Sequence, residues 1–242
     1  MRRVAQMLLA AVVVASCGPG GQDSETTVVF AASSLVDVLN DLSNDGESAF
    51  AHAVMSFASS ASLSAQVADG APVGLFVSAD RQQIDELVAS GFGVSDPQVV
   101  ARNSLVIAVE AGNPLGIQTL DDLTRPDLLL AVAAPGVPLG EYSEAMLLAA
   151  GVQVSPVTFE ADARAVLGKV VLGEVDAGIV YATDAMSSTD VDAVYISEAD
   201  TVAIEYVALE ITTAPGHANE LLTELLGERG QQVLLERGFV LP

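Results

Sequence analysis

The stretch VMSFASSASLSAQVADG, residues 54–70, carries a strand signal followed directly by a helix signal. Its first residues, 54–57, form a short apolar run, and the alanine-rich part that follows ends at Gly70, a common helix stop. We therefore predict a strand and then a helix from near Ser60, with several serines at the junction. One serine there is explained as a helix cap, because its oxygen accepts a hydrogen bond from an otherwise unpaired backbone N–H. Several neutral donors at a helix start also suit an anion.

The same order of strand, serines and helix occurs once before in the chain. The apolar run TVVFA, residues 27–31, leads to Ser33 and Ser34 and then to apolar residues spaced for one helix face: Leu35, Val38, Leu39 and Leu42. Further strands are expected at 73–77, 104–109, 128–133, 157–159, 177–181 and 203–211, with helices between most of them and two more over 217–237. Strands that alternate with helices predict an α/β protein with parallel sheets covered on both faces.

The N-terminus is predicted to be an export signal. Residues 1–16 have a basic start, an apolar segment too short to remain as a membrane span, and small residues before Cys17. The sequence Val-Ala-Ser-Cys at 14–17 resembles the bacterial lipobox, in which the cysteine becomes the lipidated first residue of the mature protein. An ordinary signal peptide with an incidental cysteine is the alternative. Residues 17–26 then serve as a flexible tether, and a sole cysteine allows no intramolecular disulfide.

Composition narrows the class of partner. The chain has 242 residues, of which 51% are hydrophobic, so it can bury a large core in one domain or two lobes. Its formal net charge of −23 disfavours nucleic acid and anionic membrane surfaces as partners, because both attract clustered Lys and Arg.

Motifs for catalysis are largely absent, and we predict that the protein is not an enzyme and has no cofactor. There is no G-x-S-x-G elbow and no phosphate-binding P-loop motif, and Cys and His are too scarce for a metal cluster. The two histidines, His52 and His217, are expected to be ordinary surface residues. A secreted serine hydrolase with Ser34 or Ser60 as its nucleophile is the rival from another class, and it lacks a convincing base.

Ser34 and Ser60 together favour an anion site. Either alone is explained as a helix cap, but the carboxyl ends of neighbouring parallel strands share one sheet edge, so both junctions face one crevice. No basic residue lies near either junction in the sequence. Recognition would therefore use neutral donors and helix dipoles, which act at short range despite the acidic surface.

Several motifs in order resemble one known family, the molybdate-binding proteins, which are the periplasmic or lipoprotein components of ABC molybdate transporters. The resemblance spans about residues 27–242. The motifs that carry it are FAASSL (30–35), SFASSASL (56–63), APVGLFVSAD (71–80), GVPLGEY (136–142), ADARAVL (161–167), AGIVYATDA (177–185) and ERGF (236–239).

The resemblance implies a two-lobed periplasmic-binding-protein fold of type II, with mixed sheets flanked by helices and the ligand cleft between the lobes. Lobe one would comprise 27–103 and 208–242, and lobe two 104–207. The implied protein is an extracytoplasmic monomer, periplasmic or held to the membrane by its lipid, that binds no nucleic acid. It would close around its ligand and present it to a membrane permease.

The resemblance also implies the ligand-binding residues. The oxyanion would be held by hydroxyls and amides of Ser34 and Ser60, by the amides of Leu139 and Ala163, and by the Tyr181 hydroxyl, with no direct metal ligand. The family often has Ala in place of Leu139 and a larger β-branched residue in place of Ala163, so the preference between molybdate and tungstate stays open. Another oxyanion, such as sulfate or phosphate, is the nearest alternative. From the sequence alone, Tyr181 could instead be a half-buried tyrosine at a strand end that is satisfied by backbone.

Overall fold

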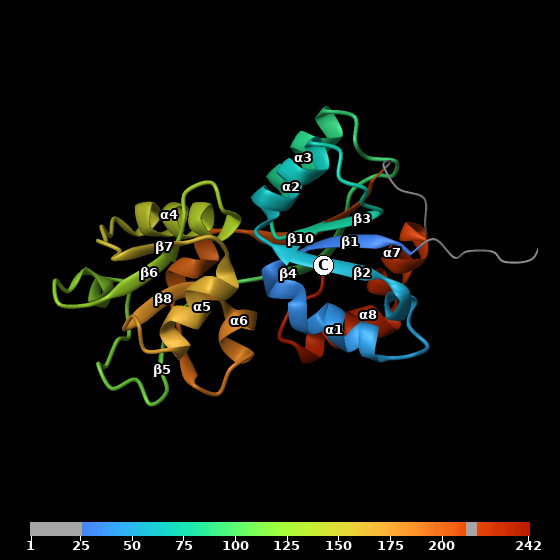
Figure 1. Ribbon diagram of the computed structural model, residues 1–242. Helices are drawn as coiled ribbons and strands as arrows, with labels where there is room; N and C mark the ends of the chain where they lie inside the picture. Colours follow the sequence, from blue (N-terminus) through green and yellow to red (C-terminus); the bar gives the residue numbers. More distant parts are fainter. Residues whose placement is uncertain (1–25, 212–216) are drawn as a thin grey trace, which may run out of the picture.

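A computed structural model describes residues 26–211 and 217–242 as two lobes joined by two connections (Figure 1). The predicted export signal, Cys17 and nearly all of the predicted tether lie outside the described residues. Within these ranges no helix is both long and apolar enough to cross a membrane.

The first lobe is built on a five-stranded sheet in which three strands are parallel. The strand order is β2 (Val54–Ala58), β1 (Val28–Ala32), β3 (Leu75–Ser78), β10 (Ile204–Glu210) and β4 (Gln98–Asn103). β2, β1 and β3 are parallel, whereas β10 is antiparallel to both of its neighbours. The helices of this lobe are α1 (Val36–Asn44), α2 (Ser60–Ala68), α3 (Arg81–Ala89), α7 (Ala218–Leu226) and α8 (Glu228–Glu236), with short 3-10 turns at Ser33–Leu35 and Ala49–His52.

The second lobe repeats this plan. Its strand order is β7 (Thr158–Glu160), β6 (Leu130–Ala133), β8 (Ala177–Tyr181), β5 (Leu105–Glu110) and β9 (Val191–Tyr195). β7, β6 and β8 are parallel, and β5 is antiparallel to both β8 and β9. The helices are α4 (Pro138–Ala150), α5 (Ala163–Val171) and α6 (Ala182–Met186), with 3-10 turns at Asp121–Thr124 and Ser197–Thr201. In Figure 1, α4 lies on one side of this sheet and α5 and α6 on the other.

The two mixed sheets confirm the fold class that the resemblance implied, and they correct the parallel sheets that alternation alone predicted. Strands β4 and β9 and helix α6 were not predicted. β4 and β9 are edge strands whose exposed side chains interrupt the apolar pattern, and α6 is only five residues long. Short or half-exposed elements give a weak periodic signal.

The core of the first lobe lies on both faces of its sheet. Successive side chains of a strand point to opposite faces, so Val29 and Ala31 pack on the α1 side while Phe30 packs among residues of α2 and α3. On β3, Leu75 and Val77 join the first cluster and Phe76 the second. Continuous apolar runs therefore mark strands covered on both faces, as the sequence predicted.

The chain crosses between the lobes twice. Sheet membership changes once at Ser104, between β4 and β5, and once between Tyr195 and Ile204, through the Ser197–Thr201 turn. β10 lies in the first sheet over its whole length. The division into lobes at 103/104 and 207/208 stays a prediction.

Candidate functional site

The carboxyl ends of the parallel strands in both sheets meet at one small cavity between the lobes. All five predicted site residues, Ser34, Ser60, Leu139, Ala163 and Tyr181, line it, together with Ala32, Ser33, Ala58, Ser59, Ala79, Val137, Pro138 and Asp162. Its volume is about 10 Å³, which is room for about one water molecule.

Three helices begin at this cavity. α2 starts at Ser60, α4 at Pro138 and α5 at Ala163. The first N–H groups of a helix have no partner within it, and the helix dipole makes this end attractive to anions. The start of α4 is packed closely on β6: a Cβ on Gly140 would lie 2.3 Å from the carbonyl oxygen of Ala134. Glycine at this position permits this close approach of α4 to the backbone of Ala133 and Ala134.

The two serines at the start of α2, Ser59 and Ser60, have different roles. The Ser59 hydroxyl caps α2, because it accepts the N–H of Ser62 at 3.3 Å. The Ser60 hydroxyl is buried and accepts the N–H of Ala79 from the end of β3, at 3.0 Å. No described group accepts the proton of this hydroxyl, so it is available to a ligand in the cavity that Ser60 lines.

Ser34 has a hydroxyl partner that the sequence analysis missed. Its Oγ lies 2.7 Å from the hydroxyl of Tyr206 on β10, and Asn103 Nδ2 donates to the same hydroxyl at 3.3 Å. Burial raises the pKa of Tyr206 above its usual value, so this group keeps its proton. Tyr206 packs edge-on against Tyr181 and Phe239, with ring centroids 5.9 Å and 5.1 Å apart. A buried tyrosine in the apolar run AIEYVALEI was the signal available in the sequence.

Tyr181 lines the cavity, and its hydroxyl is buried with no hydrogen-bond partner among the described residues. The alternative in which backbone satisfies this group is therefore wrong. Burial raises the pKa of Tyr181 well above its usual value, so the group remains a donor at neutral pH. An unpartnered buried donor is costly, and a bound acceptor in the cavity would remove that cost.

No Lys or Arg lines the cavity, and Asp162 is the carboxylate among its lining residues. Asp162 Oδ1 caps α5 by accepting the N–H of Ala165 at 3.0 Å. The described lining thus combines serine and tyrosine hydroxyls with three helix starts and contains no basic side chain.

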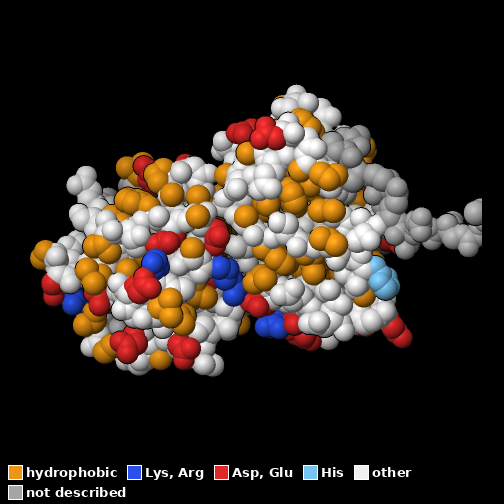
Figure 2. Space-filling view, viewed as in Figure 1, with side chains coloured by type: hydrophobic (Ala, Val, Ile, Leu, Met, Phe, Trp, Pro, Cys, Tyr) orange, Lys and Arg blue, Asp and Glu red, His pale blue; other side chains and the backbone are white. Residues whose placement is uncertain are grey.

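Arg164, which the sequence analysis missed, lies close by in space. Its guanidinium pairs with Asp37 on α1 and lies 2.8 Å from Asp184, and it lines a neighbouring cavity of about 80 Å³ that shares Ser34. Figure 2 shows basic side chains beside acidic ones where the two lobes meet. Because 127 residues separate Asp37 from Arg164, spacing in the sequence gave no signal for this cluster.

The serine hydrolase alternative has no histidine base at the cavity of Ser34 and Ser60. His52 and His217 line another cavity of the first lobe, where His217 Nδ1 lies 3.0 Å from Glu220 Oε1. No histidine lines the cavity of Ser34 and Ser60. Among residues 26–211 and 217–242, no group of three His, Cys, Asp or Glu side chains is placed to hold a metal ion.

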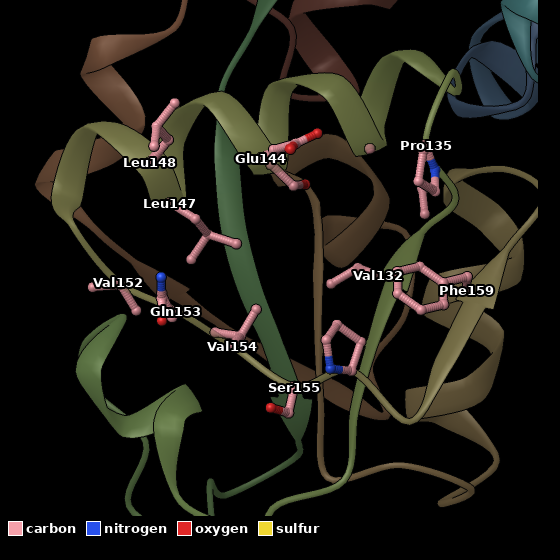
Figure 3. A pocket seen from close by; sticks show the side chains of 14 residues that line it. Val132, Pro135, Glu144, Leu147, Leu148, Val152, Gln153, Val154, Ser155 and Phe159 are labelled. Carbon is pink, nitrogen blue, oxygen red and sulfur yellow. The ribbon is translucent and has the colours of Figure 1, made fainter.

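A larger cavity of about 620 Å³ lies in the second lobe, between α4 and β7. Figure 3 shows Leu147 from α4 and Val154 from the following loop pointing into it. Val132 and Phe159 add further apolar surface. Its lining is mainly apolar, and of the two serines there, Ser143 already donates its proton to the carbonyl of Leu139.

Two lobes of this topology with a polar cavity at their junction define a two-lobed solute-binding protein. The chain belongs to the family of bacterial extracellular solute-binding proteins, whose family model matches residues 27–240. It is 34% identical over 253 residues to the molybdate-binding protein ModA of Mycobacterium tuberculosis, covering 99% of this chain and 96% of that protein.

Solved structures share the fold. The periplasmic molybdate-binding protein of Azotobacter vinelandii superposes with a TM-score of 0.76 at 20% identity, covering 89% of this chain and 99% of that one. The sulfate-binding protein SubI of Mycobacterium tuberculosis gives a TM-score of 0.74 at 20% identity, covering 88% and 86%.

Proposed function

We propose that this protein captures molybdate or tungstate outside the cytoplasm and delivers it to the membrane permease of an ABC transporter. The observation that carries the proposal is the convergence of Ser34, Ser60, Leu139, Ala163 and Tyr181 on one cavity without a basic residue. The 34% identity to a protein named for molybdate binding supports the choice of anion.

The ligand in this proposal is a fully deprotonated tetrahedral dianion. Ser60 and Tyr181 each have a hydroxyl proton that no described group accepts, and the helix starts add amide donors. Phosphate near neutral pH often keeps a proton, which needs an acceptor. Asp162 is the carboxylate available in the lining, and one of its oxygens already caps α5. We expect phosphate to bind weakly because the lining offers mainly donors, and the second oxygen of Asp162 is the carboxylate oxygen that would have to accept this proton.

Capture involves closure of the lobes. The cavity is about 10 Å³ and both lobes contribute to it, so the ligand enters an open form and is enclosed by hinge motion at the two crossings. The protein acts as a monomer and performs no chemistry on the anion. A lipid on Cys17 would keep it at the membrane, near its permease.

Calorimetric titration of the purified protein with molybdate, tungstate, sulfate and phosphate tests this function. We expect tight binding of molybdate or tungstate and much weaker binding of sulfate, whose shorter bonds cannot reach every donor at once. Sulfate is the second candidate, because the sulfate-binding protein SubI shares this fold. Sulfate or phosphate binding as tightly as molybdate would overturn the assignment.

A further inference from the structure

A chain of hydrogen bonds runs from the first crossing between the lobes to Ser34. Asn103 is the last residue of β4, directly before the crossing at Ser104. Its Nδ2 donates to Thr183 Oγ1 at 2.9 Å and to the Tyr206 hydroxyl at 3.3 Å, and that hydroxyl lies 2.7 Å from Ser34 Oγ. Thr183 belongs to α6 of the second lobe and Tyr206 to β10 of the first. The chain therefore contacts both lobes.

The direction of the Asn103 bonds in this chain is fixed by its first member. The backbone N–H of Ser104 donates to Asn103 Oδ1 at 2.9 Å. A backbone N–H can only donate, so the amide oxygen of Asn103 must face it and the amide nitrogen must face Tyr206. Nδ2 can only donate in turn, which makes the Tyr206 oxygen an acceptor.

The Tyr206 proton then has one described acceptor, Ser34 Oγ. Tyr206 is fully buried, and an unused buried hydroxyl proton would be costly. With its oxygen accepting from Tyr206, Ser34 has its own proton left to donate. Ser34 lines the cavity and Tyr206 does not, so Tyr206 acts behind the surface that an anion would touch.

We propose that Asn103 and Tyr206 are positioning residues that hold the Ser34 hydroxyl as a donor to the bound oxyanion and couple it to the second lobe through Thr183. This inference rests on the proposed function. It goes further by assigning a role to two residues outside the cavity. Each bond in such a chain polarises the next, so the Ser34 donor is strengthened in the arrangement where Asn103 contacts both lobes.

A double-mutant cycle on anion affinity tests the chain. Tyr206→Phe keeps the ring that packs on Tyr181 and Phe239 and removes only the hydroxyl. We expect it to weaken molybdate binding about 3- to 10-fold in the wild-type background, and to leave affinity unchanged when Ser34→Ala is already present. Tyr195→Phe, at a tyrosine with a 66% exposed side chain, is the matched control and should change nothing. Equal losses with and without Ser34 would overturn the proposal, because they indicate a merely structural effect.

Asn103→Asp provides a second variant of nearly the same shape. The introduced carboxylate would accept the Tyr206 proton, Ser34 would then donate to Tyr206, and the anion would lose its donor. We expect a larger loss than for Tyr206→Phe. Asn103→Asp in the Ser34→Ala background measures the through-space effect of the added charge on anion affinity. This loss should be smaller than the loss that Asn103→Asp causes in the wild-type background. No difference between the two backgrounds would contradict the inferred direction of the bonds.

Thr183→Val tests the link to the second lobe, because it removes the acceptor of Asn103 there and keeps the size. We expect Thr183→Val to reduce affinity less than Tyr206→Phe does, and we expect this loss to disappear in the Ser34→Ala background. Unchanged affinity would overturn the coupling.

Wild-type protein titrated with all four oxyanions separates this inference from the proposed function. Binding of sulfate rather than molybdate would overturn only the function, since the cycle is then measured with sulfate. Failure to bind any of the four would overturn both.

Discussion

The guanidinium of Arg164, on α5 of the second lobe, donates to the carboxylate of Asp37, on α1 of the first, beside the proposed anion cavity. Both side chains are partly buried, and both follow closely on predicted site residues: Arg164 comes one residue after Ala163 and Asp37 three after Ser34. The contact therefore joins the two lobes beside the proposed anion cavity. It exists only while the lobes are in contact.

We expect Asp37→Asn to weaken molybdate binding about 3- to 10-fold, mainly through faster release, because a partly buried ion pair is stronger than an exposed one. This variant leaves Arg164 beside Asp184. Asp45→Asn is the control, because Asp45 pairs with Arg229 within the first lobe. Stopped-flow release rates measure the effect. Equal release rates for the two variants would show that the contact does not hold the lobes closed.

Asp184 is expected to make the stability of the protein depend on pH. Burial raises its pKa to about 7, although Arg164 acts in the opposite direction. In the unfolded chain the carboxyl titrates near about 3.9. A group whose pKa is raised on folding contributes stability that is complete below the unfolded pKa and is lost as pH rises through the folded one.

The free energy of unfolding of the wild type should therefore fall between about pH 4 and pH 7, relative to that of Asp184→Asn, which has no group to titrate there. Denaturant titrations at several pH values measure this difference. Asp190→Asn, at an exposed position of the same lobe, should follow the wild type. Parallel stability profiles for wild type and Asp184→Asn would contradict the prediction.

Adjacent serines at the start of α2 should have separable effects. Ser59→Ala removes the cap and should lower the stability of the apo protein by about 1 kcal/mol with little change in affinity. Ser60→Ala removes a donor to the proposed anion and should weaken molybdate binding about 10- to 100-fold, as should Ser34→Ala. Ser64→Ala, outside the cavity, should leave affinity unchanged. Melting temperature and calorimetric affinity, measured on all four, separate these roles. Unchanged affinity in Ser34→Ala and Ser60→Ala would exclude the proposed site.

Tyr181→Phe should move stability and affinity in opposite directions. The Tyr181 hydroxyl is buried without a described partner, so its removal should stabilise the apo protein by about 1 kcal/mol. The same change removes a donor from the proposed site and should weaken molybdate binding about 10-fold. A loss of both stability and affinity would mean that the hydroxyl has a structural partner instead.

Cys17 is tested by fractionation of cells. If it is lipidated, the wild type should sediment with membranes and Cys17→Ser should be soluble or uncleaved. Two acyl chains anchor firmly because each buried CH₂ contributes roughly 0.8 kcal/mol. Equal partitioning of the two proteins would exclude the anchor.

Local patterns in the sequence determined the strand and helix at each serine junction. The fold class followed from the family resemblance, which several sequence motifs in the same order carried. Continuous apolar runs predicted β1, β3, β5, β6 and β8 because these strands are covered on both faces. Gly70 was predicted as a helix stop, and its φ angle of 90° in the structure is one that glycine adopts readily. The predicted site residues at strand ends lie in one cavity, since parallel strands share a carboxyl edge.

The tertiary structure alone decided how groups distant in the chain combine. Ser34 and Tyr206 are 172 residues apart, and Asp37 and Arg164 are 127 apart, so no periodicity connects them. The local pattern could not distinguish the cap, Ser59, from its neighbour Ser60, because both lie at the start of the same helix; only the family resemblance selected Ser60. What separates them is the packing of β3 beside β1 in the sheet, which brings the N–H of Ala79 to Ser60 Oγ and leaves the Ser60 proton to be donated.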